Sequence, residues 1–249
     1  MSIDCKSRTE IEKLRRAGQL VRGLLHEIRD RVRPGTTTLE LERYTEKRLA
    51  ELGARPAFKG YRGYPCCLCT SVNDQIVHGI PSDRRLKEGD ILSLDLGVVL
   101  DGYYGDSAIT VPVGQISEPL RELLRVTEEA LELAIQKARP GNHLGDISAT
   151  VQQHAEENHY TVVREFVGHG IGRELHEEPQ IPNYGTPGHG PVLKEGMVLA
   201  IEPMVNSGGA AVRVLDDRWT AVTEDGGYSA HFEHMVAVTH NGPDVLTRL

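Results

Sequence analysis

The feature that most constrains the fold of this 249-residue chain is an internal repeat of two short sequence patterns. Arg33-Pro34-Gly35 returns as Arg139-Pro140-Gly141, and Lys87-Glu88-Gly89 returns at almost the same offset as Lys194-Glu195-Gly196. Each triplet alone is a common match. Two triplets that return at nearly one offset, each in a similar context, indicate two homologous halves.

Helical patterns accompany the triplets in the same order in both halves. Apolar residues recur every three or four positions, as on one face of an amphipathic helix, and Ser7 with Glu10 forms a capping-box pattern. The expected helices cover residues 11–28, 38–52 and 119–135, and a further short helix starts at about 145. We therefore expect one domain over residues 1–249, with halves of roughly 8–112 and 117–240.

Composition excludes several classes of protein. The net charge of −8 argues against a binder of duplex nucleic acid, which normally has a basic surface. No apolar run is long enough for a membrane span, and the first residues lack the apolar stretch of a signal peptide. We expect a cytoplasmic protein. Its cysteines are expected to be free thiols, because three of the four crowd into residues 66–69.

Two carboxylates are predicted to lie close together in the first half. Residues 91–99 alternate between apolar and small or polar side chains, as in a strand, and Asp101-Gly102 predicts a two-residue hairpin turn. Asp106 on the returning strand then falls on the same face as Asp95, as a diagonal neighbour. Carboxylates this close repel unless a cation or a proton neutralises them, so the pattern favours a metal site.

The second half repeats this arrangement. The repeat offset places Glu202 at the position equivalent to Asp95, and a strand expected from about Phe232 to Thr239 carries Glu233 near its start. The glycine-rich segment around His169 lets the backbone approach a ligand closely. Taken singly, each of these residues has an ordinary structural explanation. Together, four carboxylates and one imidazole are an oxygen-rich set that could bridge two divalent ions.

Five segments, spread over nearly the whole chain, stand out: Ser71–Pro81, Asp95–Asp106, Gly168–Pro179, Ile201–Pro203 and His231–His234. In the right order, they resemble segments of one known family, the type I methionine aminopeptidases. The resemblance implies an α+β protein with the pita-bread fold, in which two pseudo-symmetric α/β halves surround a curved antiparallel sheet. It also implies a metal-dependent enzyme, one catalytic domain that removes the initiator methionine when the second residue is small.

The resemblance also implies roles for individual residues. Glu202 would be the general base as well as a metal ligand, and His78 and His176 would be catalytic histidines that face the substrate. The metal ligands would be Asp95, Asp106, His169, Glu202 and Glu233. They would hold two divalent ions, either Co, Mn or Fe(II), with Zn as a further candidate, because carboxylate-rich ligation suits such ions better than thiolate-preferring ones.

The implied methionine pocket consists of Tyr61, Tyr64, Cys69 and Trp219, since aromatic and sulfur contacts suit a thioether. Phe58 stands where many bacterial members have Cys, and Leu175 where many have Phe, so the walls of the pocket differ while its apolar character is retained. The implied partners are the N-termini of nascent polypeptides, with ribosome association left open, no membrane, and a monomeric chain.

Two alternatives remain open at this point. One is an Xaa-Pro aminopeptidase or dipeptidase of the same fold, although such relatives usually carry an additional N-terminal domain. The other is a non-catalytic pita-bread protein that binds RNA or another protein. Such proteins typically lose metal ligands, whereas all five ligand positions are filled in this chain.

Overall fold

The computed structural model describes residues 3–249, and its elements occur in a similar order in the two halves. In the first half they are α1 (Arg8–Arg29), α2 (Thr38–Glu51), β1 (Arg55–Pro56), the 3-10 turn η1 (Tyr61–Gly63), β2 (Leu68–Val72), β3 (Gln75–Val77), β4 (Ile91–Leu100) and β5 (Tyr103–Pro112). In the second half they are α3 (Glu118–Ile135), α4 (Leu144–Glu157), β6 (Thr161–Val162), β7 (Gly168–Gly170), β8 (Glu177–Ile181), β9 (Val198–Ile201), β10 (Met204–Asn206), β11 (Val212–Val214), β12 (Ala221–Thr223), β13 (Ser229–His231), β14 (His234–Thr239) and β15 (Gly242–Val245). The four expected helices are confirmed. The capping box at the start of α1 is also present, because Ser7 N–H donates to Glu10 Oε2 at 3.0 Å.

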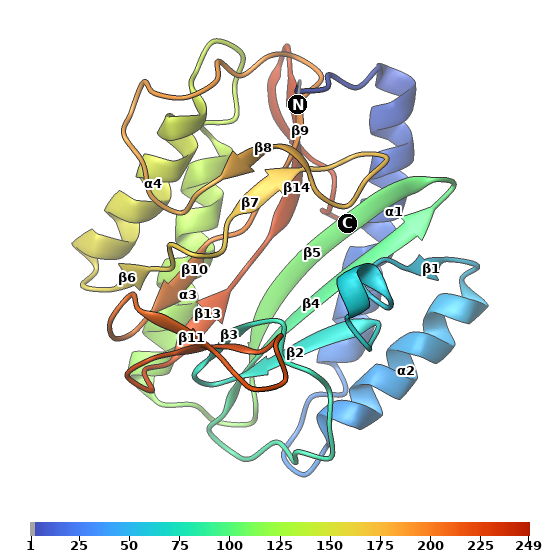
Figure 1. Ribbon diagram of the computed structural model, residues 1–249, viewed down its shortest axis with the longest axis vertical. Coiled ribbons are helices and arrows are strands. Elements are labelled where there is room, and N and C mark those ends of the chain that lie inside the picture. The colour runs from blue at the N-terminus through green and yellow to red at the C-terminus, as the bar shows by residue number, and fades with distance from the viewer. Residues whose placement is uncertain (1–2) are drawn as a thin grey trace.

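The strands form antiparallel sheets. The long hairpin of β4 and β5 pairs with β1 and β2, and a second sheet has the order β15-β14-β9-β7-β8. Two smaller sheets, β13-β10-β6 and β11-β12-β3, lie beside them. Figure 1 shows α1 and α2 beside the first sheet and α3 and α4 beside the second. The mixture of helices with antiparallel strands is the expected α+β class.

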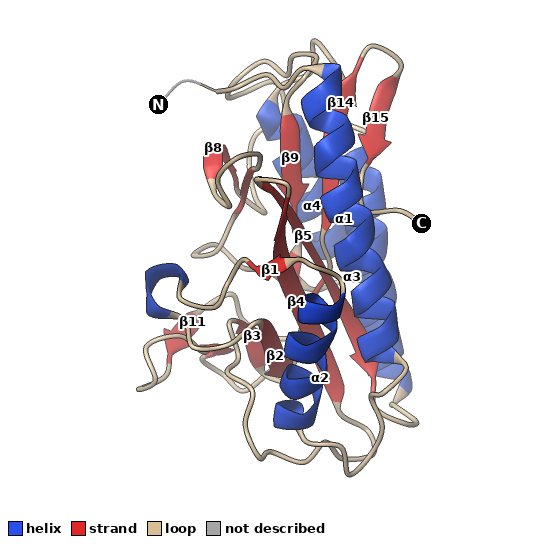
Figure 2. Cartoon of the chain, turned by 90° about the vertical axis from the view of Figure 1, so that its right-hand side faces the viewer, coloured by secondary structure: helices blue, strands red, loops and turns tan. Residues whose placement is uncertain are grey.

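The helices form a layer behind the strands. Figure 2 shows α1, α3 and α4 on one side of β4, β5 and β9, whereas β8 and β11 lie on the other side and β15 lies on the helix side. The alternation of side chains along β4 explains how the first sheet packs against these helices. Leu92, Leu94 and Leu96 point to the same face and are fully buried in one apolar core with residues of α1. Within residues 3–249 no helix combines the length and apolarity that a membrane span requires.

The repeated triplets form equivalent turns in the two halves. Gly35 and Gly141 both have φ of +91°, where a side chain would be strained. Gly35 N–H donates to the Leu86 carbonyl at 2.8 Å, and Gly141 N–H donates to the Leu193 carbonyl at 3.0 Å. Leu86 and Leu193 each immediately precede a Lys-Glu-Gly triplet. This shared geometry supports our proposal that residues 8–112 and 117–240 are duplicated halves of one domain.

Candidate active site

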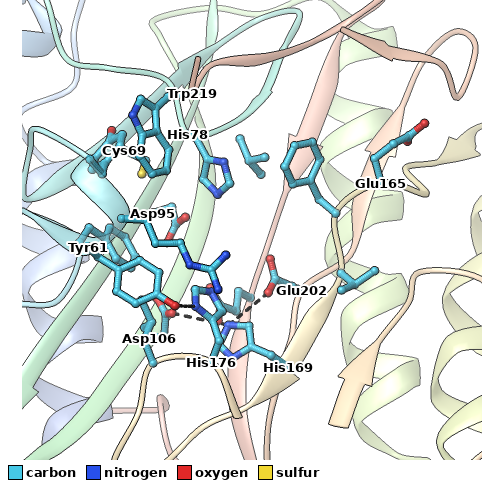
Figure 3. A pocket seen from close by; sticks show the side chains of 18 residues that line it. Tyr61, Cys69, His78, Asp95, Asp106, Glu165, His169, His176, Glu202 and Trp219 are labelled. Carbon is cyan, nitrogen blue, oxygen red and sulfur yellow. Dashed lines mark hydrogen bonds and ion pairs between the residues drawn. The ribbon is translucent and has the colours of Figure 1, made fainter. Parts of the chain in front are cut away.

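A cavity of about 320 Å³ opens between the two halves of the chain, and it is lined by residues from both. Figure 3 shows Asp95 and Asp106 facing His169 and Glu202 across it, with Trp219, Cys69 and His78 toward one end. Every candidate site residue named from the sequence lines this cavity. These residues are Tyr61, Tyr64, Cys69, His78, Asp95, Asp106, His169, His176, Glu202, Trp219 and Glu233.

The hairpin of β4 and β5 positions the two aspartates as the sequence predicts. Leu100 is paired with Tyr103 across the turn, and Gly97 is paired with Asp106. Asp95 is paired with Ala108, so Asp95 and Asp106 are diagonal neighbours on one face of the hairpin. The short side chain of Ala108 leaves room between them.

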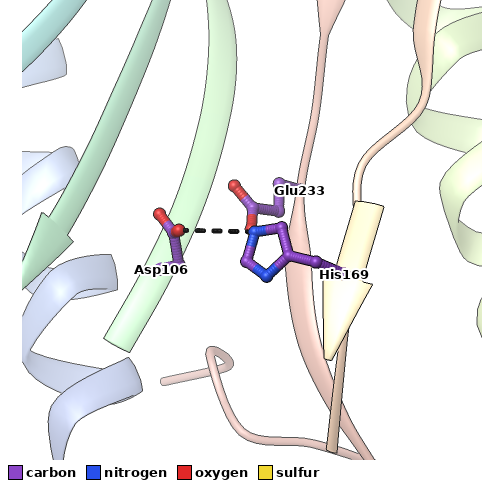
Figure 4. A group of neighbouring side chains, drawn as sticks. All are labelled: Asp106, His169 and Glu233. Atoms are coloured by element: carbon purple, nitrogen blue, oxygen red, sulfur yellow. Dashed lines mark ion pairs between the residues drawn. The ribbon is translucent and has the colours of Figure 1, made fainter. Parts of the chain in front are cut away.

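Asp106, His169 and Glu233 form the tightest cluster in the cavity. One potential ligand atom from each of the three lies within 4.8 Å of the others. Figure 4 shows that the three side chains come from three separate segments and point toward one another. They are only 4%, 6% and 2% exposed, respectively. A buried group of two carboxylates and an imidazole is a suitable donor set for a divalent metal ion.

The hydrogen bond of His169 determines which ring nitrogen faces this cluster. Its Nδ1 lies 2.9 Å from the Gly170 carbonyl, which can only accept, so Nδ1 carries the proton and donates it. The lone pair of Nε2 is then free on the side of the carboxylates, 3.6 Å from Glu202 Oε1 and 3.9 Å from Asp106 Oδ2. Histidines that bind metals commonly donate their second N–H to a carbonyl in this way.

Glu233 lies between two strands, and not inside one as the sequence predicted. The sequence predicted a strand from about Phe232, but β14 begins at His234, and Glu233 joins β13 to β14. The reason is that Glu233 N–H donates to the Ala108 carbonyl of β5 at 3.0 Å instead of pairing with β9. This contact with the first half places the Glu233 carboxylate beside Asp106.

Burial makes ionised carboxylates unfavourable here. It raises the pKa of Asp95 to about 7 and the pKa of Glu202 to about 8. Burial, with the neighbouring carboxylates adding to it, also raises the pKa values of Asp106 and Glu233. Among the described residues none of the four has a Lys or Arg ion-pair partner, and Asp95 Oδ1, Asp106 Oδ1 and Glu233 Oε1 are buried without hydrogen bonds. Such a site is suited to bound cations, which neutralise the carboxylates.

Two further histidines lie in the cavity wall in their neutral form at neutral pH. Burial lowers the pKa of His78 to about 4 and, helped by the nearby Arg62 guanidinium, also lowers the pKa of His176 to about 4. His78 has φ of +61°, and its ring makes an edge contact with Phe166 at 5.3 Å. His176 Nδ1 lies 2.7 Å from the Tyr61 hydroxyl. Both rings are thus fixed by aromatic neighbours.

The apolar end of the cavity is formed around β2 and β4. Cys69 is paired with Asp95, and the Tyr64 ring makes an edge contact with Trp219 at a centroid distance of 5.2 Å. Phe58 lies over Gly97, where an added Cβ would come within 2.5 Å of the Phe58 ring. Phe58 and Leu175 both line the cavity, so the two positions that depart from the family pattern contribute apolar walls.

Sequence reasoning missed several residues near this site. Arg62, Glu165 and Phe166 line the cavity, and His231 lies behind Glu202, with its Nε2 3.4 Å from Glu202 Oε2. Tyr61 was expected only as a wall of the methionine pocket, but its hydroxyl also contacts His176. The signal for His231 was its place in the segment His231–His234, which resembles the family, two residues before Glu233. The others lie in segments without a periodic pattern.

The chain is similar to known metallopeptidases over almost its entire length. A model of metallopeptidase family M24 matches residues 12–240. Methionine aminopeptidase 1 of Bacillus subtilis is 51% identical over 99% of this chain and 100% of its own length. The crystal structure of a methionine aminopeptidase from Thermotoga maritima has a TM-score of 0.98 at 50% identity and covers 100% of both chains. A prolidase from Pyrococcus furiosus is less similar, with a TM-score of 0.79 and 27% identity over 98% of this chain and 65% of its own. These likenesses confirm the expected pita-bread fold.

Proposed function

Because this chain belongs to metallopeptidase family M24, we propose that it is a methionine aminopeptidase, which hydrolytically removes the initiator methionine from nascent polypeptides. The observation that carries this proposal is the buried cluster of carboxylates and His169 at the base of a cavity with an apolar end. The greater similarity to methionine aminopeptidases than to a prolidase favours methionine over proline-directed cleavage. We propose that it prefers polypeptides in which the residue after the initiator methionine is small.

The metal site would be formed by Asp95, Asp106, His169, Glu202 and Glu233. We propose that it holds two divalent ions, with Mn, Fe(II) or Co favoured by the oxygen-rich donor set and Zn as a further candidate. When bound, such ions lower the pKa of a coordinated water so that hydroxide is available near neutral pH. The free Nε2 lone pair of His169 and the unpaired carboxylate oxygens support this assignment.

Three side chains would act directly on the substrate. Glu202 would accept the proton of the attacking water, a role open to a carboxylate that bound cations keep ionised. His176, oriented by Tyr61, would stabilise the oxyanion that forms on the first peptide carbonyl. His78 would hydrogen-bond the scissile amide. The methionine side chain would lie against Tyr61, Tyr64, Cys69 and Trp219, with Phe58 and Leu175 completing the walls.

The setting of the reaction follows from the proposed substrate. A nascent chain exposes its N-terminus in the cytoplasm, and association with the ribosome would bring the two together. We propose that a single chain is sufficient, because residues of one chain supply every side chain invoked in the reaction.

The proposal predicts a narrow substrate range. The purified protein, assayed with Mn, Fe(II), Co or Zn, is expected to release methionine from Met-Ala-Ser and to leave Ala-Pro peptides intact. A peptide with a bulky second residue should be cleaved more slowly. Mass spectrometry of the products provides the measurement. Cleavage of Ala-Pro peptides without methionine release would overturn the assignment in favour of an Xaa-Pro hydrolase.

Phe58 provides a test of the methionine pocket. Replacing Phe58 by Ala removes an apolar wall, and the KM for Met-Ala-Ser is expected to rise about tenfold or more, since a lost apolar contact costs about 1–3 kcal/mol. The kcat should change little, because Phe58 takes no part in the proposed proton transfer or in the stabilisation of the oxyanion. Steady-state kinetics measure both. Leu133→Ala, which truncates an exposed apolar side chain on α3, is the control and should match the unmodified protein. An unchanged KM in F58A would remove Phe58 from the pocket.

A further inference from the structure

His231 is a buried histidine that lies beside the candidate metal site but does not line the cavity. Its side chain is 1% exposed, and within the described residues neither ring nitrogen has a hydrogen-bond partner. A buried imidazole without partners is costly, so its surroundings require an explanation. The nearest acidic group is Glu202, whose Oε2 lies 3.4 Å from His231 Nε2.

The backbone of His231 is held firmly by the opposite half of the molecule. His231 N–H donates to Thr110 Oγ1 at 2.8 Å, and the Thr110 hydroxyl donates back to the His231 carbonyl at 2.8 Å. Ser93 Oγ lies 2.8 Å from the same Thr110 oxygen, which joins the pair to β4. On its other edge, His231 is paired with Met204 of β10. The backbone position of His231, from which the imidazole extends, is therefore fixed by strands on both sides.

Glu202 lies between two imidazoles that differ in what they can donate. Its Oε1 is 3.6 Å from His169 Nε2, which carries a lone pair because Nδ1 of that ring holds the proton. His169 therefore cannot donate to Glu202. Oε2 of Glu202 faces His231 instead. Nε2 of His231 can carry a proton and has no competing acceptor among the described residues. One oxygen of Glu202 thus faces the metal cluster and the other faces a potential donor.

We infer that His231 is a positioning residue: its Nε2 lies 3.4 Å from Oε2 of Glu202 without a hydrogen bond, and a small rotation of either side chain lets Nε2–H donate to that oxygen and keep Oε1 directed toward the metal cluster. The inference rests on the proposed role of Glu202 as metal ligand and base. Groups that orient a ligand from behind typically alter metal affinity or activity about 10- to 100-fold when they are lost. His231 would act in this way without touching the substrate.

The test compares three substitutions at this position. His231→Gln keeps an N–H donor at about the reach of Nε2, whereas His231→Asn places its amide where Nδ1 lies, too short to reach Glu202. His231→Leu has no donor. The kcat for Met-Ala-Ser is expected to fall about 10- to 100-fold in H231L and H231N while KM stays nearly constant, and H231Q should retain most activity. Calorimetric titration of the metal-free proteins with Mn²⁺ should show weaker binding in H231L and H231N only.

His154 provides a matched control on the outer layer of the molecule. Its Nε2 lies 3.3 Å from Glu129 Oε2, a similar histidine–glutamate pair that is away from the cavity. His154→Leu should leave both kcat and Mn²⁺ affinity unchanged. If H231Q were as impaired as H231N, or if H231N matched the unmodified protein, the positioning role would be overturned. Failure of the unmodified protein to bind Mn²⁺ would instead contradict the proposed metal site itself.

Discussion

Replacing Asp106 by Asn is expected to abolish peptide hydrolysis and to remove most of the affinity for divalent metal ions. Asp106 belongs to the tightest cluster of potential ligands, and its carboxylate has no Lys or Arg partner among the described residues that could explain its burial otherwise. An amide has nearly the same shape but lacks the charge that the metal requires. Because metal assistance is worth several kcal/mol at the transition state, kcat/KM should fall by at least about 10³-fold.

Asp101→Asn is the matched control for this substitution. Asp101 lies at the turn of the same hairpin, where it is exposed and forms an ion pair with Arg16 at 3.1 Å. Its φ of +51° is one that asparagine adopts readily, so the turn should be preserved. D101N is therefore expected to keep full activity and metal content, measured by methionine release and by elemental analysis. A D106N variant that retained metal and activity would contradict the proposed ligand set. If the chain were a non-catalytic binding protein, both variants would still bind its partner.

The local part of this site could be predicted from sequence because it depends on short-range geometry. Strand alternation and the Asp101-Gly102 turn fix the register of one hairpin, and the register then fixes the relative positions of Asp95 and Asp106. The repeat extended this reasoning to Glu202 without any long-range contact being known. The glycines around His169 predicted a close backbone approach to a ligand, whereas the structure shows Gly168 close to the Ala200 carbonyl of β9, where a Cβ would come within 2.4 Å of that oxygen.

The contacts between the two halves of the chain could not be predicted in the same way. Hydrogen bonds from β5 to residues 231–233 join segments more than a hundred positions apart, and no local pattern specifies them. Ser107 Oγ donates to the Glu233 carbonyl at 2.8 Å, which helps to fix a residue that the sequence placed inside a strand. The contact of Tyr61 with His176 likewise depends on a turn in which Arg62 has positive φ. These contacts arise only when the two sheets pack together.

Metal-free protein is expected to lose stability as the pH rises from about 6.5 to 8, and divalent metal should reverse that loss. Burial raises the pKa of Asp95 to about 7 and that of Glu202 to about 8, and it raises those of Asp106 and Glu233 as well. In this window the unfolded chain has already released these protons while the folded chain still holds them. Unfolding therefore becomes more favourable with each step in pH.

The lower limit of this pH window is set by buried histidines, which change the free energy of unfolding with pH in the direction opposite to the carboxylates. Burial lowers the pKa values of His78, His169, His176, His231 and His234. Each of these groups adds stability as the pH rises through 6.5, the ordinary value for histidine, and this gain fades over about one pH unit above it. Between pH 6.5 and 8 the carboxylates therefore act against an opposition that becomes steadily smaller. Burial also raises the pKa values of Cys66 and Cys67, but to about 11 and 12, so these thiols have their effect at higher pH.

Thermal unfolding of chelator-treated protein measures this balance directly. The four carboxylates together should lower the free energy of unfolding by a few kcal/mol between pH 6.5 and 8, which corresponds to a fall in Tm on the order of 10 °C. Added Mn²⁺ should raise Tm far more at pH 8 than at pH 6.5, because its ligands must be deprotonated and it binds only the folded state. Glu202→Gln, which cannot ionise, should make the metal-free decline shallower. A metal-free Tm that stayed level or rose over this interval would mean that the carboxylates are not held together by the fold in their uncharged form.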